Sequence, residues 1–445
     1  MNNSIASSVT EKQQKRNQIA YIFEAGFEYF VSILITDAFL ATLLKRTGFT
    51  DAQSGIITQM ASFALVAQLF SVFIRKNSGM KPWITGMHLI NQLMFVMLYG
   101  LALFDLSPDV KKLLFVMLFF GGNLIANVVS PYKLPWMMSF VPDNKRGVFT
   151  AVKEMTNLVA GMALSFIMGS VVDYYNALGA ANPEMRVWGF LCEDFALLIC
   201  GITVFASMIL HTLSIVVMKD RRKEETQTSG DSRFGIKEAL RRTFGNHALV
   251  KLIFIDIMWQ AASGVAVAFY GVYKINELGF SLQYISIIGI IGAIGRLAFA
   301  LVFASIADKR SWTTMLSICF VIAAASFGIN IFTTPENGKV MFLIYSIVFS
   351  VASAGLGSGL YNILFDFVPQ SDRAAGLGIK NTFGGITALL ASMAGSAILS
   401  HIQSNGNMLF GIHIYAQQVL SAIAFVIMIV LCIYMRCVIA KLRKY

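Results

Sequence analysis

The chain alternates long apolar stretches with short polar ones along nearly all of its 445 residues. A helix that crosses about 30 Å of hydrocarbon needs roughly 20 mainly apolar residues, because each residue adds about 1.5 Å. Twelve stretches meet this requirement, which predicts an all-α integral membrane protein with twelve transmembrane helices. They lie near residues 20–44, 54–74, 83–104, 112–136, 148–173, 189–217, 250–274, 281–306, 313–333, 340–364, 375–399 and 412–436.

Composition excludes the soluble classes of protein. Only 13% of the residues are charged and 56% are hydrophobic, whereas a soluble chain of this length would fold as two or three domains with polar surfaces. The net charge of +11 does not indicate nucleic-acid binding, since the basic residues lie mostly between apolar runs. The five histidines lack metal-ligand spacing and no phosphate loop is present, so we expect no metal and no cofactor.

The basic residues also predict the orientation in the membrane. Lysine and arginine are retained in short loops on the cytoplasmic side. If the N-terminus is cytoplasmic, 24 of the 35 basic residues fall on the inside and seven on the outside. We therefore expect a multi-pass plasma-membrane protein with both termini in the cytoplasm. The short loops favour a prokaryotic inner membrane.

A long polar stretch near the centre of the chain divides six predicted spans from six. We predict a cytoplasmic tail, a six-helix bundle, a central cytoplasmic loop, a second six-helix bundle and a second tail. The second part of the central loop, FGIKEALRRTFG, has the spacing of a short amphipathic helix on the membrane surface. The predicted boundaries are 1–19, 20–217, 218–249, 250–437 and 438–445.

The two halves repeat each other in sequence. Segment 140–153, FVPDNKRGVFTAVK, matches segment 367–380, FVPQSDRAAGLGIK, and each follows the fourth predicted span of its half. Residues 48–50, Gly-Phe-Thr, likewise match residues 279–281, Gly-Phe-Ser. Since each half has six spans, the halves share one orientation and are parallel repeats about an axis along the membrane normal.

With this repeat, the chain resembles the major facilitator superfamily over nearly its whole length. That family often has a loop G-x-x-x-D-R/K-x-G-R-R after spans 2 and 8. The second copy is present as Ala304-Ser-Ile-Ala-Asp308-Lys-Arg, whereas the first, residues 73–79, lacks the aspartate. The resemblance implies a cytoplasmic latch that involves Asp308 and Arg373. It also implies a central cavity lined by spans 1, 4, 7 and 10.

Ionised residues inside apolar spans are the strongest site candidates, because each one costs several kcal/mol unless it has a partner or a watery cavity. Glu24 and Glu28 are four residues apart on one face of span 1, and Asp256 lies at a similar depth in span 7. By the resemblance, all three could face the central cavity. Glu24 and Asp256 could instead reach headgroups or water at the interface. Glu28 is deeper and is our favoured proton carrier.

Basic residues offer partners for these carboxylates. Arg296 in span 8 is either an anchor for the solute or the ion-pair partner of Glu28 or Asp256. Lys153 and Lys380 each follow an arginine by seven residues on the same helix face. We therefore assign them to a cytoplasmic gate that also contains the residues Arg146, Arg373 and Asp308.

Polar and aromatic residues in other spans could bind an organic solute by hydrogen bonds and ring contacts. The alternative is that they form hydrogen bonds between helices. The candidates are Asn123, Asn127, Trp259, Tyr361 and Asn362.

These patterns predict a secondary active transporter that moves a small organic solute by alternating access. Proton coupling is our leading prediction, and a sodium-coupled symporter or a multidrug-type exporter of the same fold is the alternative. An enzyme is not expected, since no nucleophile–base pair or metal motif is found. The acidic residues in spans 1 and 7 argue against an anion exchanger, and the lining suits sugars, nucleosides or amphipathic drugs. The expected partners are the solute, a proton or sodium ion and membrane lipid. We expect no binding of nucleic acid, and we expect the protein to be a monomer.

Overall fold

The computed structural model describes residues 11–73, 80–142, 145–219, 236–368 and 370–442. The first half of the chain forms seven α-helices and a 3₁₀ segment. They are α1 (Glu11–Leu34), α2 (Asp37–Arg46), α3 (Asp51–Phe63), η1 (Ala64–Phe73), α4 (Met80–Leu103), α5 (Pro108–Met138), α6 (Arg146–Ala181) and α7 (Cys192–Val217).

The second half is also helical. Its first membrane-spanning stretch is continued by short 3₁₀, α and π segments. The elements are α8 (Ile236–Gly245), α9 (His247–Ala266), η3 (Val267–Phe269), α10 (Tyr270–Val272), η4 (Tyr273–Glu277), α11 (Leu282–Lys309), α12 (Trp312–Asn330), α13 (Gly338–Phe367), α14 (Gln370–Ser404), α15 (Ala416–Cys437) and η5 (Ile439–Lys441).

The predicted all-α membrane fold is confirmed, but the number of spans differs from twelve. Within the described residues, ten helices are long and apolar enough to cross a bilayer, or eleven if α1 and α2 form one bent span. The difference lies near residues 54–74, where α3 ends and η1 continues. Because a 3₁₀ helix rises about 2.0 Å per residue, α3 and η1 each add roughly 20 Å. Together they are long enough to span the bilayer, although neither helix is by itself.

The first predicted span is a bent pair of helices. The axes of α1 and α2 differ by 48°. The break is at Asp37, whose φ of +50° lies in the left-handed region, which aspartate tolerates better than bulky residues. The α1 helix begins at Glu11, whereas the sequence predicted a span from about residue 20.

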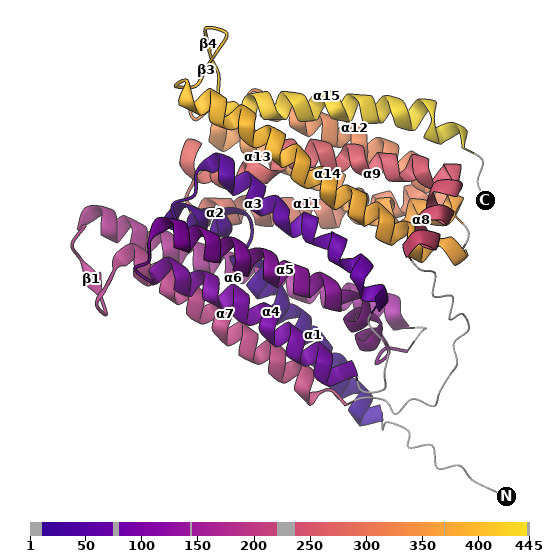
Figure 1. Cartoon of the computed structure of the whole chain (residues 1–445), viewed down its shortest axis with the longest axis horizontal. Coiled ribbons are helices and arrows are strands. Elements are labelled where there is room, and N and C mark those ends of the chain that lie inside the picture. The colour runs from indigo at the N-terminus through magenta and orange to yellow at the C-terminus, as the bar shows by residue number, and fades with distance from the viewer. Residues whose placement is uncertain (1–10, 74–79, 143–144, 220–235, 369, 443–445) are drawn as a thin grey trace, which may run out of the picture.

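The helices form two bundles that lie side by side, α1–α7 in one and α9–α15 in the other (Figure 1). The start of α1 and the end of α15 lie at one end of the molecule, which we call the terminal end. Two β-hairpins lie at the opposite end, which we call the hairpin end (Figure 1). The predicted amphipathic helix of the central loop is present as α8, at the terminal end. Residues 220–235 of that loop lie outside the described residues.

The internal repeat is visible in the backbone. Gly48 and Gly279 both have positive φ, at +84° and +62°. Two residues after each glycine, Thr50 and Ser281 accept hydrogen bonds from the backbone N–H groups at the starts of α3 and α11. The repeated turn thus places the same cap before the second helix of each bundle.

The two hairpins are a further repeat, which the sequence comparison did not detect. Strand β1 (Arg186–Val187) pairs with β2 (Phe190–Leu191), and β3 (Met408–Leu409) pairs with β4 (Ile412–His413). Each hairpin precedes the last long helix of its bundle. Its two turn residues both have positive φ, as in the type I′ turns that fit twisted hairpins.

Helix α3 packs against α14, and α6 packs against α11, so these two pairs join the bundles. Gly385 of α14 is essential to the first pair. A Cβ atom at this position would lie 2.4 Å from the carbonyl oxygen of Ser62 on α3. No real Cβ contact is that short, so the backbones can approach only because residue 385 is glycine.

We expect the Gly385→Ala variant to disfavour the observed packing of the bundles by about 1–3 kcal/mol, a typical cost of overpacking. Thermal unfolding of the purified protein in detergent measures this loss. Gly357→Ala is the matched control, since nothing lies within 4 Å of a Cβ atom at that position. An alanine there is expected to be neutral or slightly stabilising. Equal melting temperatures for the two variants would contradict the prediction.

Candidate functional site

Two carboxylates and one ammonium group form the centre of the first site. Lys133 of α5 lies 2.6 Å from Glu24 Oε1 and 2.6 Å from Glu28 Oε2, both on α1. The side chain of Glu24 is 1% exposed and that of Glu28 is 38% exposed. The i, i+4 spacing that placed both glutamates on one helix face therefore lets one lysine bridge them. Glu24 is the buried member and Glu28 is the accessible one.

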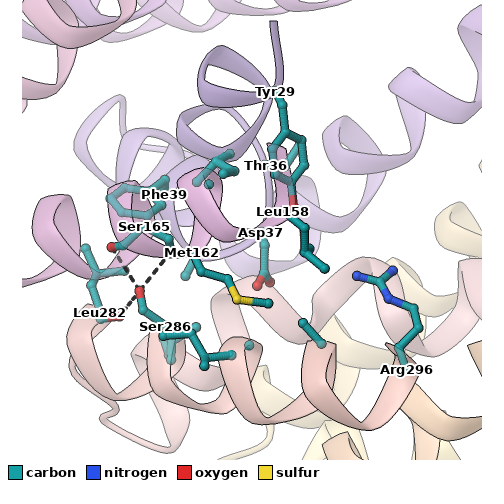
Figure 2. A pocket seen from close by; sticks show the side chains of 17 residues that line it. Tyr29, Thr36, Asp37, Phe39, Leu158, Met162, Ser165, Leu282, Ser286 and Arg296 are labelled. Carbon is teal, nitrogen blue, oxygen red and sulfur yellow. Dashed lines mark hydrogen bonds between the residues drawn. The ribbon is translucent and has the colours of Figure 1, made fainter. Parts of the chain in front are cut away.

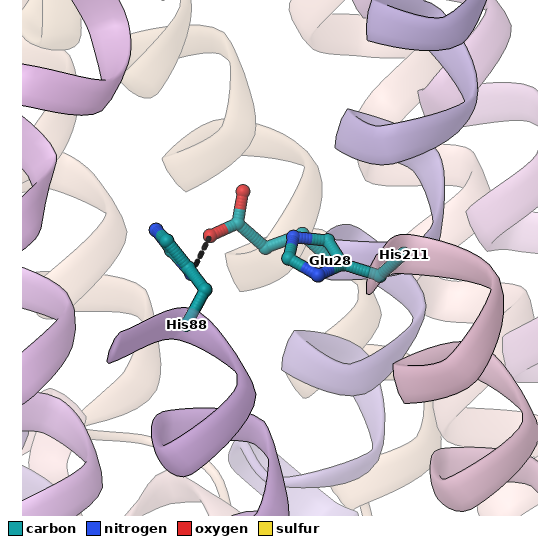
Figure 3. A group of neighbouring side chains, drawn as sticks. All are labelled: Glu28, His88 and His211. Carbon is teal, nitrogen blue, oxygen red and sulfur yellow. Dashed lines mark ion pairs between the residues drawn. The ribbon is translucent and has the colours of Figure 1, made fainter. Parts of the chain in front are cut away.

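Two histidines complete this cluster, which we call the α1 charge cluster: Glu24, Glu28, His88, Lys133 and His211. The imidazole Nε2 of His211 lies 2.9 Å from Glu24 Oε1, and Nδ1 of His88 lies 4.0 Å from Glu28 Oε1. Figure 3 shows Glu28, His88 and His211 approaching one another from α1, α4 and α7. Both rings are buried, and three of their four nitrogens have no hydrogen-bond partner. These polar atoms are available to a proton or a ligand.

Nitrogen and oxygen atoms of Glu28, His88 and His211 all lie within 4.8 Å of one another, close enough to be considered as metal ligands. This group could not be predicted from the sequence, because its members are far apart in the chain. However, the ammonium of Lys133 already lies between the two carboxylates. A divalent cation at this place would meet that positive charge, so the geometry does not favour a metal.

The α1 charge cluster opens into a cavity of about 290 Å³ inside the first bundle. Glu24, Glu28, His88 and Lys133 all line it, together with Asn127 and Lys153. The ammonium of Lys153, which we had assigned to a gate, lies 4.9 Å from the centre of the Tyr21 ring and 3.1 Å from Glu154. Lys153 is therefore part of the wall of the cavity.

The second bundle contains a simpler ion pair. Lys380 of α14 donates to Asp256 Oδ1 of α9 at 3.2 Å, and both side chains are at most 5% exposed. Lys380 also donates to the carbonyl of Leu360. From its sequence position we expected Arg296 to be either an anchor for the solute or the ion-pair partner of Glu28 or Asp256. The structure shows instead that Lys133 and Lys380 take these places, which leaves Arg296 without either partner.

A chain of amide groups links the bundles. Asn123 and Asn127 each donate to a backbone carbonyl four residues earlier on α5. Gln68 of η1 donates to Asn127 Oδ1 at 3.2 Å and accepts from Asn381 of α14 at 3.3 Å. Asn127 therefore forms a hydrogen bond between helices, which was the alternative to a contact with the solute.

The remaining solute-contact candidates lie in different surroundings. Trp259 packs within the second bundle, with its ring centroid 6.2 Å from that of Phe320 and 6.3 Å from that of Phe349. Tyr361 is 50% exposed, and its ring lies 5.1 Å from the ammonium of Lys380. Asn362 is half-buried. The structure therefore brings Tyr361, but not Trp259, beside a charged pair.

Two of the predicted gate residues are exposed. Asp308 lies near the end of α11, and Arg146 is the first residue of α6. The side chain of Arg373 and the loop at 74–79 lie outside the described residues.

At the hairpin end, polar contacts hold the two bundles together. Asp37 of α2 forms an ion pair with Lys274 of η4. Asp51 of α3 accepts a hydrogen bond from Asn276 at 2.6 Å. Asp173 of α6 accepts two hydrogen bonds, at 2.9 and 2.7 Å, from the N–H groups at the start of α11. These contacts close the interface at this end.

A second cavity, of about 260 Å³, lies between the bundles, among α1, α2, α6 and α11. Asp37 and Arg296 both line it (Figure 2). Ser165 of α6 and Ser286 of α11 meet at its wall, with their hydroxyl oxygens 2.9 Å apart. We call this space the inter-bundle cavity.

Sequence reasoning missed three members of the α1 charge cluster. Lys133 gave a usable signal, since it is one of only four basic residues that fall within or at the ends of the predicted spans. An ionised lysine in an apolar span requires a counter-charge. His88 and His211 gave no such signal, because a neutral imidazole is inexpensive to bury when compared with an ion.

Comparisons with known proteins agree with this architecture. The sequence matches the profile of the Major Facilitator Superfamily over residues 19–392. No curated protein gives a significant match. The crystal structure of the nucleoside transporter NupG is similar, with a TM-score of 0.69 and 14% sequence identity, over 97% of this chain and 100% of that chain.

Two further solved structures share the fold. A bacterial homologue of the human lysosomal transporter Spinster, inward-facing and unoccupied, has a TM-score of 0.68 and 14% identity, over 96% of this chain and 97% of that one. The E. coli fucose:proton symporter FucP has a TM-score of 0.54 and 13% identity, over 96% and 98%. At these identities the likeness concerns the fold alone.

Proposed function

The chain belongs to the Major Facilitator Superfamily, and from this premise we propose that it is a proton-coupled secondary active transporter of a small organic solute. The observation that carries the proposal is the α1 charge cluster. The solved structures of similar fold include proteins named as a nucleoside transporter and a fucose:proton symporter, which supports a polar organic solute and a proton.

The charges of the cluster suit it to carrying one proton. Glu24 and Glu28 provide two negative charges and Lys133 provides one positive charge, while the histidines are neutral when unprotonated. One negative charge is left over, and binding of a single proton removes it. Glu28 is the accessible carboxylate on the cavity, so it is the natural acceptor, with Glu24 and His211 behind it.

Alternating access requires that the contacts at the hairpin end open and close. If the termini are cytoplasmic, as the distribution of basic residues predicts, the hairpin end faces outward and is closed in this conformation. The Asp37–Lys274 pair and the bonds from α11 to Asp173 would then form an outer gate. Opening of this gate would be matched by closure at the terminal end, where Asp308 and Arg146 lie.

The proposal is tested by charge movement in proteoliposomes on a solid-supported membrane. The panel contains sugars, nucleosides, carboxylates, amino acids and cationic drugs, each at one acidic and one alkaline pH. We expect at least one solute to give a current that depends on pH in sodium-free buffer.

A current that appears only with sodium would replace the proton by sodium as the coupling ion. The position of Lys133 between the carboxylates argues against this outcome, because the ammonium occupies the space that a sodium ion would need. Binding of a solute with neither a current nor uptake of the labelled solute driven by a proton gradient would contradict proton-coupled transport.

A further inference from the structure

Arg296 differs from the other basic residues inside the spans. Lys133, Lys153 and Lys380 each form an ion pair with a carboxylate. Within the described part of the chain, no carboxylate pairs with Arg296. It is the fifteenth residue of the 28-residue helix α11, so it lies about halfway along a span. A guanidinium cannot lose its charge in a protein, and at this depth it requires a counter-charge or water.

The acidic residue on the inter-bundle cavity and the one beside the start of α11 have their own partners. Asp37 lies on the same cavity but pairs with Lys274. Asp173, on the neighbouring helix α6, binds the N–H groups at the start of α11. The charges that line the inter-bundle cavity, counted with Lys274, therefore sum to one unpaired positive charge. The acids Glu24, Glu28 and Asp256 do not oppose an anionic solute here, since none of them lines the inter-bundle cavity.

The remaining walls of the inter-bundle cavity are suited to an organic acid. The hydroxyl of Tyr29 makes no hydrogen bond within the described residues and is a second free donor. Gly161 makes room for the Tyr29 ring, since a Cβ atom there would lie 2.3 Å from a ring carbon. Apolar side chains such as Leu158 and Met162 form much of the rest (Figure 2). Its volume of about 260 Å³ is below the range of drug-binding pockets.

We infer that the inter-bundle cavity binds a small organic monoanion, whose carboxylate pairs with Arg296 and accepts a hydrogen bond from Tyr29. The guanidinium suits this role because it binds both oxygens of a carboxylate at once. Asp37 faces the same space and disfavours a second negative charge. This inference names the solute class of the proposed transporter and therefore rests on that function.

The test is ligand binding to the purified protein, measured as the shift in thermal unfolding temperature and by calorimetry. The probes are lactate, benzoate and glucuronate, each compared with a neutral counterpart, namely lactamide, benzamide and glucose. We expect at least one acid, and not its neutral counterpart, to bind. Arg296→Gln is expected to weaken this binding roughly ten- to hundredfold, as for loss of charged hydrogen bonds. Arg296→Lys should keep part of it.

Gly289→Leu separates binding from folding. Gly289 lines the cavity and nothing lies within 4 Å of a Cβ atom there, so the leucine side chain begins in open space and extends into the cavity. It should abolish acid binding while Arg296 is intact. Arg186→Gln is the matched control, since Arg186 lies in the exposed β1–β2 hairpin and its loss should leave binding unchanged.

Two results would overturn the inference: none of the acids binds, or the Arg296→Gln and Gly289→Leu variants bind them as well as the unchanged protein does. Its failure can be told apart from failure of the proposed function. Proton-dependent currents with sugars or nucleosides that survive Arg296→Gln would retain the transporter and refute the anion site. Acid binding that depends on Arg296 but gives no uptake of the labelled acid into proteoliposomes would retain the site and refute the transporter.

Discussion

Glu28→Gln is expected to abolish accumulation of solute against its gradient in proteoliposomes. Glutamine has nearly the same shape and keeps a hydrogen bond to Lys133, but it cannot take up a proton. Uptake driven by an imposed proton gradient should therefore stop at equal concentrations on the two sides. Exchange of labelled for unlabelled solute should continue, because it needs binding and alternating access but no net proton movement. The pH dependence of uptake should also be lost.

Glu336→Gln provides the control for this experiment, since Glu336 is exposed in the connection between α12 and α13 and lines neither cavity. Accumulation by that variant should equal that of the unchanged protein. If Glu28→Gln still accumulates solute with the same dependence on pH, Glu28 is not the proton carrier. Glu24 and Asp256 would then be the next residues to replace.

Lys133→Met is expected to cause the largest loss of stability among single changes at the site. It removes the ammonium that neutralises two carboxylates, and Glu24 is almost fully buried. Breaking a buried ion pair by removing one partner costs about 3–5 kcal/mol, because the other charge is left uncompensated. The melting temperature of the purified variant should fall markedly at alkaline pH. The loss should shrink at acidic pH, where protonation removes the unpaired negative charges.

The double variant Glu24→Gln/Lys133→Met separates charge from packing, since it removes the buried negative charge together with its partner. It should be more stable than Lys133→Met alone. Lys339→Met is the surface control, because Lys339 is exposed and belongs to no described ion pair. A Lys133→Met protein that melts like the Lys339→Met protein at every pH would show that the lysine does not neutralise the cluster.

Much of the fold could be predicted because a bilayer imposes a strong and local rule. Each span needs about 20 apolar residues, so the spans are visible in the sequence one by one. The exceptions arose where the backbone departs from a single α-helix. The first span bends at Asp37, and the second span continues after Phe63 as a 3₁₀ segment. Neither change alters the apolar pattern from which the spans were predicted.

The candidate site was predicted only in part. The cost of burying a charge identified Glu24, Glu28 and Asp256 as residues that need partners, whereas Lys380 was assigned to a cytoplasmic gate. The partners themselves depend on which helices are neighbours. Lys133 is 109 residues from Glu24, and spacing along the chain could not show that α5 places its ammonium against α1.

The sequence by itself determined that this protein spans a membrane as two repeated helical bundles, because length, apolar runs and charge bias act locally on each segment. It also determined which residues are too costly to bury alone. Only the tertiary structure decided how those charges are matched. Packing brings His88 and His211 beside the glutamates of α1 and places Lys380 against Asp256. Among the residues that the structure describes, Arg296 is left without a carboxylate partner on the cavity between the bundles. Ion pairing acts over a few ångströms in space, and the helix packing sets those distances.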